Sequence, residues 1–219
     1  MRSQTNKLAS ALILSAILTY FVTQFHATQS MWNTNPRATV HRIVAGDSRG
    51  SGTAVAASGG QTLVLTAWHV VSDGGPYTVA GKPAKLVATD KIWDLAALVV
   101  DDTMVSSRLS RQQPNYGDTL TVCGYGSEAY SENTGVVVGW GSPGPGYPAD
   151  WVIINARARS GDSGGPFFYD DGTVGAVLWG SDSSGAHGTL CVRVRKFLLT
   201  VVGYDNLIKA ALSFDYSIW

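Results

Sequence analysis

Gly161-Asp162-Ser163-Gly164-Gly165-Pro166 decides the fold of this chain, and its serine is a candidate nucleophile. Glycines on both sides of the serine permit a sharp turn and leave backbone N–H groups free to face a bound group. A serine hydroxyl is a weak nucleophile near neutral pH, so it needs a base and a third group that holds the base. The chain offers His69 in Thr66–His69 and Asp94 in Asp94–Ala96, both upstream of the serine. The order histidine, aspartate, serine predicts a single site for nucleophilic catalysis.

Three blocks of sequence resemble the chymotrypsin-like (trypsin-fold) serine peptidases, and within them the compact bacterial type that is similar to the HtrA catalytic domain. The blocks are Gly50–Ala54 leading to Leu65–Val71, then Trp93–Leu98, then Ser160–Phe168 with Gly175–Gly180. The Gly-Asp-Ser-Gly-Gly-Pro motif alone is moderately specific for this family. All three blocks in this order and spacing are highly specific.

The resemblance implies an all-β fold of two six-stranded antiparallel β-barrels with a short C-terminal helix. The sequence itself predicts an N-terminal apolar export segment ahead of this domain. The peptidase domain would span residues 38–212, with the catalytic groups in the cleft between the barrels. The implied activity is that of a serine endopeptidase that forms an acyl-enzyme on Ser163. His69 would be the general base, Asp94 would orient it, and the N–H groups of Gly161 and Ser163 would form the oxyanion hole. The resemblance implies a protein or peptide substrate and no cofactor.

Substrate-binding residues are also implied by the family pattern. Arg157, six residues before the serine, matches the base of the pocket for the side chain on the acyl side of the cleaved bond. A cationic residue there favours an acidic substrate side chain, unless Arg157 points to solvent instead. Leu178, Trp179 and Gly180 match the segment that pairs with extended substrate as an added strand. His187, between Gly185 and Gly188, either edges the substrate pocket or is an exposed loop histidine, and we expect the second.

Composition supports the same fold class and excludes some partners. Of the 219 residues only 15% are charged and the formal net charge is zero, which gives no electrostatic footprint for nucleic acid. The 25 glycines and many short apolar runs favour an all-β domain with tight turns. The pattern predicts a short helical turn at 67–71, a surface loop at 141–148 and a helix at 205–212. Strands are expected at 39–46, 52–57, 62–66, 77–79, 84–89, 95–100, 119–124, 135–140, 151–156, 166–169, 173–179 and 188–194.

The two cysteines, Cys123 and Cys191, leave two interpretations open. They form a disulfide, or they are two buried free thiols that pack as small apolar residues. No partner ligand lies at metal-site spacing from either cysteine, so we expect no metal site.

The N-terminus has the pattern of an export signal. Arg2 and Lys7 precede an apolar run at 8–22, which is short for a membrane-spanning helix. Residues 1–30 are therefore expected to be a signal peptide or a retained signal-anchor with its linker. In both cases the domain would be secreted or periplasmic, or anchored to the membrane through residues 8–22 and facing outside the cytoplasm.

Three alternatives compete with this interpretation. Arg42-Ile43 resembles the activation site of trypsin-like zymogens, in which a freed amine pairs with the residue that matches Asp162; the simpler interpretation is a first barrel strand. The motif also fits the Gly-x-Ser-x-Gly pattern of α/β-hydrolase esterases, but Gly164-Gly165-Pro166 opposes the helix that this pattern requires. A catalytically inactive binding module on a protease fold stays open, because all three catalytic residue types are present whether or not they are correctly docked.

Overall fold

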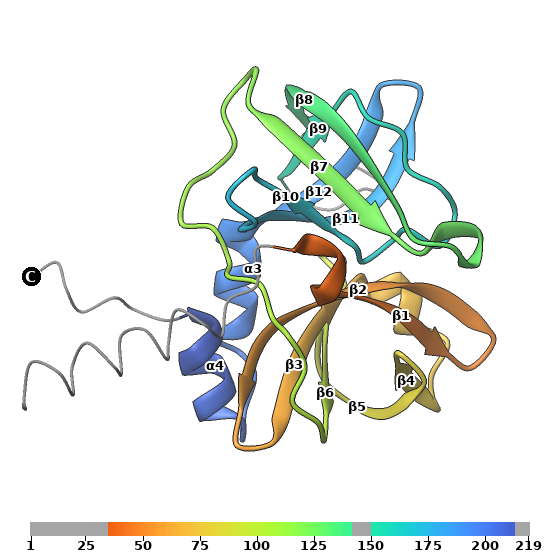
Figure 1. Ribbon diagram of the computed structural model, residues 1–219, viewed down its shortest axis with the longest axis vertical. Coiled ribbons are helices and arrows are strands. Elements are labelled where there is room, and N and C mark those ends of the chain that lie inside the picture. The colour runs from red at the N-terminus through yellow and green to blue at the C-terminus, as the bar shows by residue number, and fades with distance from the viewer. Residues whose placement is uncertain (1–34, 142–149, 213–219) are drawn as a thin grey trace, which may run out of the picture. The chain divides into compact units, whose positions relative to one another are not determined.

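Two closed antiparallel β-barrels follow one another along the chain in the computed structural model, which describes residues 35–141 and 150–212 (Figure 1). The first barrel has the strand order β1-β2-β3-β6-β5-β4. Its strands are β1 Val40–Ala45, β2 Ser48–Ser58, β3 Gln61–Thr66, β4 Tyr77–Val79, β5 Lys82–Asp90 and β6 Leu95–Val100. The continuous apolar sequence of β6 is buried along its full length, as expected for a strand that faces apolar groups on both sides.

The second barrel has the order β10-β11-β12-β9-β8-β7 and closes in the same way. Its strands are β7 Thr119–Gly124, β8 Ser131–Gly141, β9 Trp151–Ile154, β10 Pro166–Phe168, β11 Val174–Asp182 and β12 Gly185–Leu190. The predicted fold of two six-stranded antiparallel barrels is therefore confirmed. Most of the predicted loop at 141–148 and the apolar segment at 8–22 lie outside the described residues.

Short helices connect and cover the barrels. They are η1 Pro36–Thr39, α2 Trp68–Val71, η2 Gly126–Glu128, α3 Cys191–Leu198 and α4 Asp205–Leu212. The predicted helix at 205–212 is confirmed, but the strand expected at 188–194 is wrong beyond Leu190. Residues 192–195 alternate valine and arginine as a strand does, whereas the buried residues Cys191, Val194, Phe197 and Leu198 follow helical spacing.

The apolar core has three parts. One cluster fills the first barrel around Ile43 and Leu98, and another fills the second barrel around Ile154. The third lies between the barrels and includes Leu63 and Phe168 together with the buried faces of α3 and α4. Helix α4 follows the second barrel in sequence but packs on β2 and β3 of the first barrel (Figure 1). The C-terminal segment therefore helps to fix how the two barrels dock.

Both cysteines are free thiols in this shared core, so the interpretation as two buried free thiols is confirmed and the disulfide is not formed. Burial raises the pKa of Cys123 to about 11 and that of Cys191 to about 12. Both therefore stay protonated and pack as apolar residues at neutral pH.

Within residues 35–141 and 150–212, no helix has both the length and the apolar character needed to cross a membrane.

Candidate active site

A histidine and an aspartate of the first barrel form a two-point contact. His69 is the second residue of α2, and Asp94 directly precedes β6. The His69 Nδ1 atom lies 2.7 Å from Asp94 Oδ2, and the His69 backbone N–H donates to Asp94 Oδ1 at 2.9 Å. The Asp94 side chain is 9% exposed, whereas that of His69 is 43% exposed, so the ring is held from its buried side and is open to solvent on the other.

The backbone around Asp94 is held in an unusual conformation. Asp94 has a φ of +49°, in the left-handed region that aspartate tolerates better than most residues. The preceding carbonyl, of Trp93, accepts a hydrogen bond from Thr189 Oγ1 of β12 at 2.8 Å. A strand of the second barrel therefore supports the loop that carries Asp94 in the first.

Ser163 lies in the loop between β9 and β10 and is partly exposed. Gly161 and Gly164 have φ values of +89° and +85°, which glycine adopts without the penalty other residues incur. The N–H groups of Asp162, Gly164 and Gly165 donate to backbone carbonyls at 2.7–3.0 Å. Among the described residues, no acceptor is bonded to the N–H of Gly161 or Ser163. The loop thus leaves two backbone donors unused, and these are the two that were expected to bind an oxyanion.

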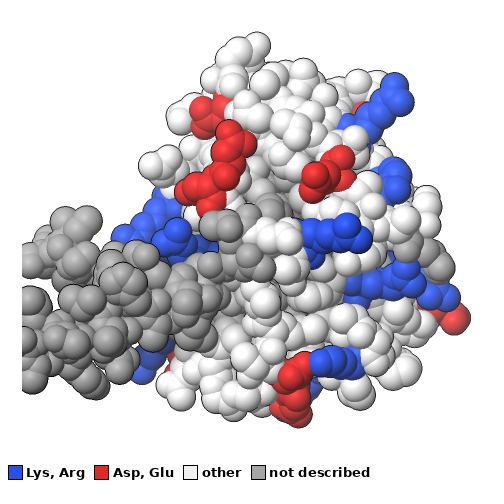
Figure 2. All heavy atoms as spheres, in the orientation of Figure 1, with Lys and Arg blue, Asp and Glu red and all other residues white. Residues whose placement is uncertain are grey.

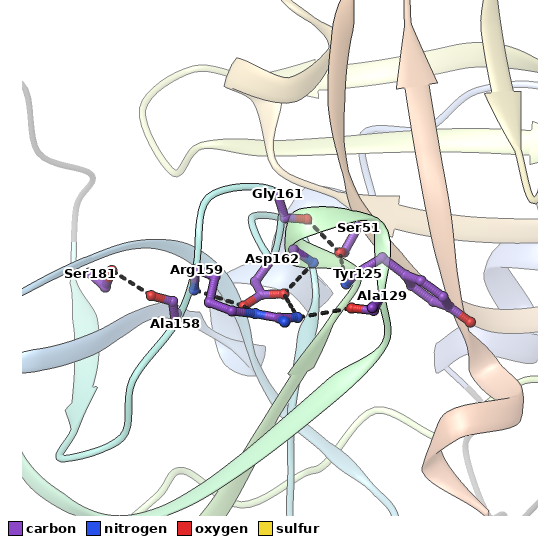
Figure 3. A network of polar contacts seen from close by, with 9 residues as sticks. Ser51, Tyr125, Ala129, Ala158, Arg159, Gly161, Asp162 and Ser181 are labelled. Carbon is purple, nitrogen blue, oxygen red and sulfur yellow. Dashed lines mark hydrogen bonds and ion pairs between the residues drawn. The ribbon is translucent and has the colours of Figure 1, made fainter.

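Ser51 of β2 ties this loop to the first barrel (Figure 3). Its N–H donates to the carbonyl of Ser163 at 2.8 Å, and its Oγ donates to the carbonyl of Gly161 at 2.8 Å. The same Oγ accepts the N–H of Tyr125 at 2.8 Å, so its donor and acceptor capacities are both used. Ser51 is fully buried, which makes each of these bonds expensive to lose.

Close backbone packing brings the Ser163 loop beside the segment that carries His69. A Cβ atom placed on Gly164 would clash with Ser51 O and Thr66 Oγ1. A Cβ atom placed on Gly50 would lie 2.6 Å from the Val70 side chain and 3.0 Å from Ser163 O. The serine loop therefore packs closely against Thr66, and Gly50 lies between Ser163 and Val70. In the described part of the chain no hydrogen bond joins the Ser163 hydroxyl to the His69 ring.

Asp162 is buried and is surrounded by donors (Figure 3). Its Oδ2 accepts the N–H of Arg159 at 2.7 Å, and its Oδ1 accepts the N–H of Gly126 at 2.6 Å. The Arg159 guanidinium also contacts both carboxylate oxygens, at 3.2 and 3.3 Å, and donates to the carbonyl of Ala129 at 2.9 Å. Arg159 supplies the positive charge that a buried carboxylate requires. Ile43, the residue whose freed amine would pair with Asp162 in a zymogen-like activation, is fully buried inside β1.

The residues expected to bind substrate differ in their exposure and in their place relative to the serine loop. Arg157 is exposed on the loop after β9, which corresponds to the solvent-facing alternative. Leu178 is buried and uses its backbone to hold the serine loop, since Gly164 N–H donates to its carbonyl at 2.7 Å. Trp179 and Gly180 follow it in β11 and are partly exposed beside that loop. The ladder to β12 shifts register between Leu178 and Gly180, so Trp179 lies at an irregularity of the sheet.

The expectation for His187 is wrong. It lies in β12, is 3% exposed, and packs against the rings of Trp151 and Trp179 at centroid distances of 6.3 and 5.2 Å. Its Nε2 lies 3.0 Å from Ser184 Oγ and 3.2 Å from Asp182 Oδ1. The glycines on either side of His187 are typical of a loop, but in this structure they are part of strand β12. The rings of Trp151 and Trp179 on the neighbouring strands enclose the imidazole.

Ser51 and Arg159 were not assigned roles from the sequence. Both lie in or next to blocks that carry the resemblance, but neither has a spacing that indicates its partner. The bonds of Ser51 to Tyr125, Gly161 and Ser163 cross 74 to 112 positions of the chain, so only the docked barrels reveal them. No group of three or more metal-binding side chains occurs in the residues that the structure describes.

Comparison with known proteins identifies the family of this fold. Residues 50–177 match the trypsin-like peptidase domain family, which is more than half of the chain, and the protein belongs to that family. None of the curated proteins is detectably similar in sequence.

Solved structures share the fold. The Rv3671c protease from M. tuberculosis in its active form has a TM-score of 0.65 at 23% identity, covering 75% of this chain and 81% of that one. The same protease in an inactive form has the same TM-score and identity, covering 75% and 89%. The serine endoprotease from Yersinia pestis has a TM-score of 0.63 at 19% identity, covering 81% and 67%. The HtrA-type protease AlgW with a decapeptide has a TM-score of 0.62 at 19% identity, covering 72% and 63%.

Proposed function

We propose that this protein is a serine endopeptidase that cleaves peptide bonds through an acyl-enzyme on Ser163. The proposal is carried by one observation above all. Among residues 35–141 and 150–212, no acceptor is bonded to the N–H groups of Gly161 and Ser163, while the N–H groups between and after them are bonded. Two free donors in a loop held by glycines are suited to stabilise the negative charge of a tetrahedral intermediate.

The proposed first step forms a bond from Ser163 Oγ to the carbonyl carbon of the substrate. His69 Nε2 takes the hydroxyl proton, while Nδ1 keeps its own proton in the bond to Asp94. The carbonyl oxygen becomes an oxyanion facing the two free N–H groups. His69 then gives its proton to the departing amine, the carbon–nitrogen bond breaks, and an ester on Ser163 remains. Water activated by His69 hydrolyses the ester and regenerates the hydroxyl.

A protease-fold binding module without catalytic activity is the second candidate. It is favoured by one observation, namely that no bond links the Ser163 hydroxyl to the His69 ring among the described residues. Such bonds are often long without substrate and shorten in the complex, which keeps the endopeptidase as the first candidate.

Peptide hydrolysis by the wild-type chain and the Ser163→Ala variant tests the proposal. A proteome-derived peptide library is incubated with each protein, and new termini are identified by mass spectrometry. We expect many cleavages with the wild type and a loss of roughly 10³-fold or more with the variant, because triad members act as a unit. Equal cleavage by both proteins would reject Ser163 as the nucleophile.

We also propose that the domain acts outside the cytoplasm, either released or anchored through residues 8–22. Support comes from the basic residues Arg2 and Lys7 ahead of the apolar run. Cell fractionation combined with N-terminal sequencing distinguishes the two forms. A mature chain that starts after residue 22 indicates a cleaved signal, and recovery in the cytosolic fraction would contradict both.

A further inference from the structure

A cavity of about 290 Å³ lies beside the loop of the candidate nucleophile. Its volume is near the lower end of the range for small-ligand sites, enough for one or two amino-acid side chains. Its walls come from the β1–β2 hairpin, the segment around η2 and the serine loop. The residues that line it are Arg42, Arg49, Gly50, Tyr125, Ser127, Ser160 and Gly161.

The cavity touches the reacting centre directly. Gly161, whose N–H is one of the two free donors, forms part of its wall. The carbonyl of Gly161 is held by Ser51, and Tyr125 is held by the same hydroxyl. The wall is therefore fixed to both barrels, and a substrate bonded at Ser163 would have neighbouring residues within reach of the cavity.

Two arginines line this cavity. Arg42 and Arg49 lie on facing strands, with Val44 paired to Arg49 and Arg42 paired to Ser51. Because side chains two positions apart share a face, both arginines project from the same face of the hairpin as diagonal neighbours. Figure 2 shows Lys and Arg side chains gathered over the region of the β1–β2 hairpin that Figure 1 shows at the right.

The two flanks of the serine loop indicate which half of the substrate, acyl or leaving, faces the cavity. On one flank the loop is bonded to Leu178 of β11, where Trp179 and Gly180 continue as the segment expected to pair with the acyl half of the substrate. The cavity lies on the other flank, against the first barrel and Tyr125. A chain that crosses Ser163 with its acyl half along β11 therefore directs its leaving half toward the cavity.

We propose that this cavity binds an acidic substrate side chain on the leaving-group side, at the first or second residue after the cleaved bond. The proposal rests on the proposed endopeptidase function and names its substrate class: peptides with Asp or Glu immediately after the cleavage position. Arginine suits this task because its planar fork pairs with carboxylates and keeps its charge at any physiological pH.

Cleavage-site profiling tests the selectivity. The peptide library is digested with the wild type, and the residues around each new terminus are counted. We expect Asp and Glu to be enriched at the first two positions after the cut. A matched pair of peptides that differ only by Glu or Gln at the enriched position should then differ roughly five- to tenfold in kcat/KM. Enrichment only before the cut, or none, overturns the proposal.

Variants assign the effect to the two arginines. In Arg42→Gln/Arg49→Gln the Glu-to-Gln ratio of kcat/KM should fall to about one, and Arg49→Glu should favour Lys over Glu. Arg108→Gln is the control, since Arg108 is exposed and does not line the cavity, and it should keep the wild-type ratio. An unchanged ratio in the double variant assigns selectivity elsewhere and rejects the cavity.

A binding measurement separates this proposal from the proposed function. The Ser163→Ala chain is titrated with acetyl-Glu-Glu-amide and with acetyl-Gln-Gln-amide, and backbone amide shifts are followed by NMR. We expect the acidic peptide alone to shift the amides of Gly161 and Ser127, and the shifts to vanish in the double arginine variant. If this occurs without peptide hydrolysis by the wild type, the endopeptidase function fails and the acidic-peptide site stands. If the wild type hydrolyses peptides but neither these shifts nor the enrichment is seen, the endopeptidase function stands and the acidic-peptide site is rejected.

Discussion

Arg159 and Asp162, three positions apart in one loop, form an ion pair in which the Arg159 Nη2 atom lies 3.2 Å from Asp162 Oδ1. The carboxylate is almost fully buried directly before the candidate nucleophile, and the guanidinium also reaches the carbonyl of Ala129. The chain thus carries its own cation for Asp162. A freed amine at Ile43 is not needed to neutralise this carboxylate, which favours the interpretation of 39–46 as a plain barrel strand.

Arg159→Ala should loosen the serine loop. The buried carboxylate would lose its charged partner, which costs about 1–3 kcal/mol, and the displaced loop should lower kcat/KM roughly 10- to 100-fold. Denaturant unfolding and peptide hydrolysis measure the two effects. Arg159→Lys should recover part of the activity because the charge is kept, whereas Arg108→Gln should leave both measurements at wild-type values. Full activity in Arg159→Ala would show that the ion pair does not support the loop.

Ser51→Ala should uncouple the loop from the first barrel. The carbonyl of Gly161 would lose a donor and the N–H of Tyr125 an acceptor, each buried, for a destabilisation of about 1–3 kcal/mol. We expect the KM for neutral peptides to change less than kcat, because the oxyanion donors rather than the binding surface are displaced. Ser48→Ala removes an exposed bond to Asp73 and is the matched control. A wild-type kcat in Ser51→Ala would contradict this role.

Gly164→Ala should inactivate the protein, whereas Gly60→Ala should not. Both glycines have positive φ, at +85° and +79°, so both substitutions incur a backbone penalty of about 1 kcal/mol. A Cβ on Gly60 meets open space, but a Cβ on Gly164 meets the first barrel. Overpacking should destabilise Gly164→Ala by a further ~1–3 kcal/mol and displace Ser163. Similar stability and activity in the two variants would disprove the tight docking of this loop.

The free energy of unfolding should fall as the pH drops below 6.5. Burial, aided by the nearby Lys82 ammonium, lowers the pKa of His41 from 6.5 to about 4, and burial also lowers the pKa of His187. Above pH 6.5 these rings are neutral in both states, so they add no pH dependence. Below pH 6.5 these histidines are protonated in the unfolded chain but stay neutral in the folded protein. The free energy of unfolding therefore falls by at most about 1.4 kcal/mol per pH unit for each histidine.

His41→Gln tests the larger of these effects. Denaturant unfolding from pH 7 to 5 should show a shallower loss of stability in His41→Gln than in the wild type. Parallel pH profiles for the two proteins would mean that His41 does not titrate abnormally.

Most strands of both barrels could be predicted from the sequence, because they are short apolar runs between glycine-rich turns, whereas the two-barrel arrangement was implied by the family resemblance. The strands β4, β6 and β7 and the helix α4 have the expected bounds. Helix α3 was missed since its Val-Arg-Val-Arg start alternates like a strand, and only packing against the core selects the helical face that Val194 and Phe197 share. Burial of His187 was missed for a similar reason, because it depends on packing against Trp151 and Trp179 of β9 and β11, the two strands paired with β12.

In the candidate site, too, local motifs could be predicted from the sequence and long-range contacts could not. His69, Asp94 and Ser163 are indicated by local motifs, and the first two are in contact. The supports of the site are bonds between segments far apart in sequence, such as Ser51 to Gly161, and no local pattern encodes them. The arginine-lined cavity likewise depends on the register that aligns Arg42 and Arg49 on one face of a hairpin.

Covalent labelling with a fluorophosphonate tests the central claim most directly, because the reagent reacts only with an activated serine. Mass spectrometry of the labelled protein should find the phosphonyl group on Ser163, with labelling lost in His69→Ala and strongly reduced in Asp94→Asn. A folded wild-type protein that stays unlabelled, or one labelled equally well without His69, would contradict the account.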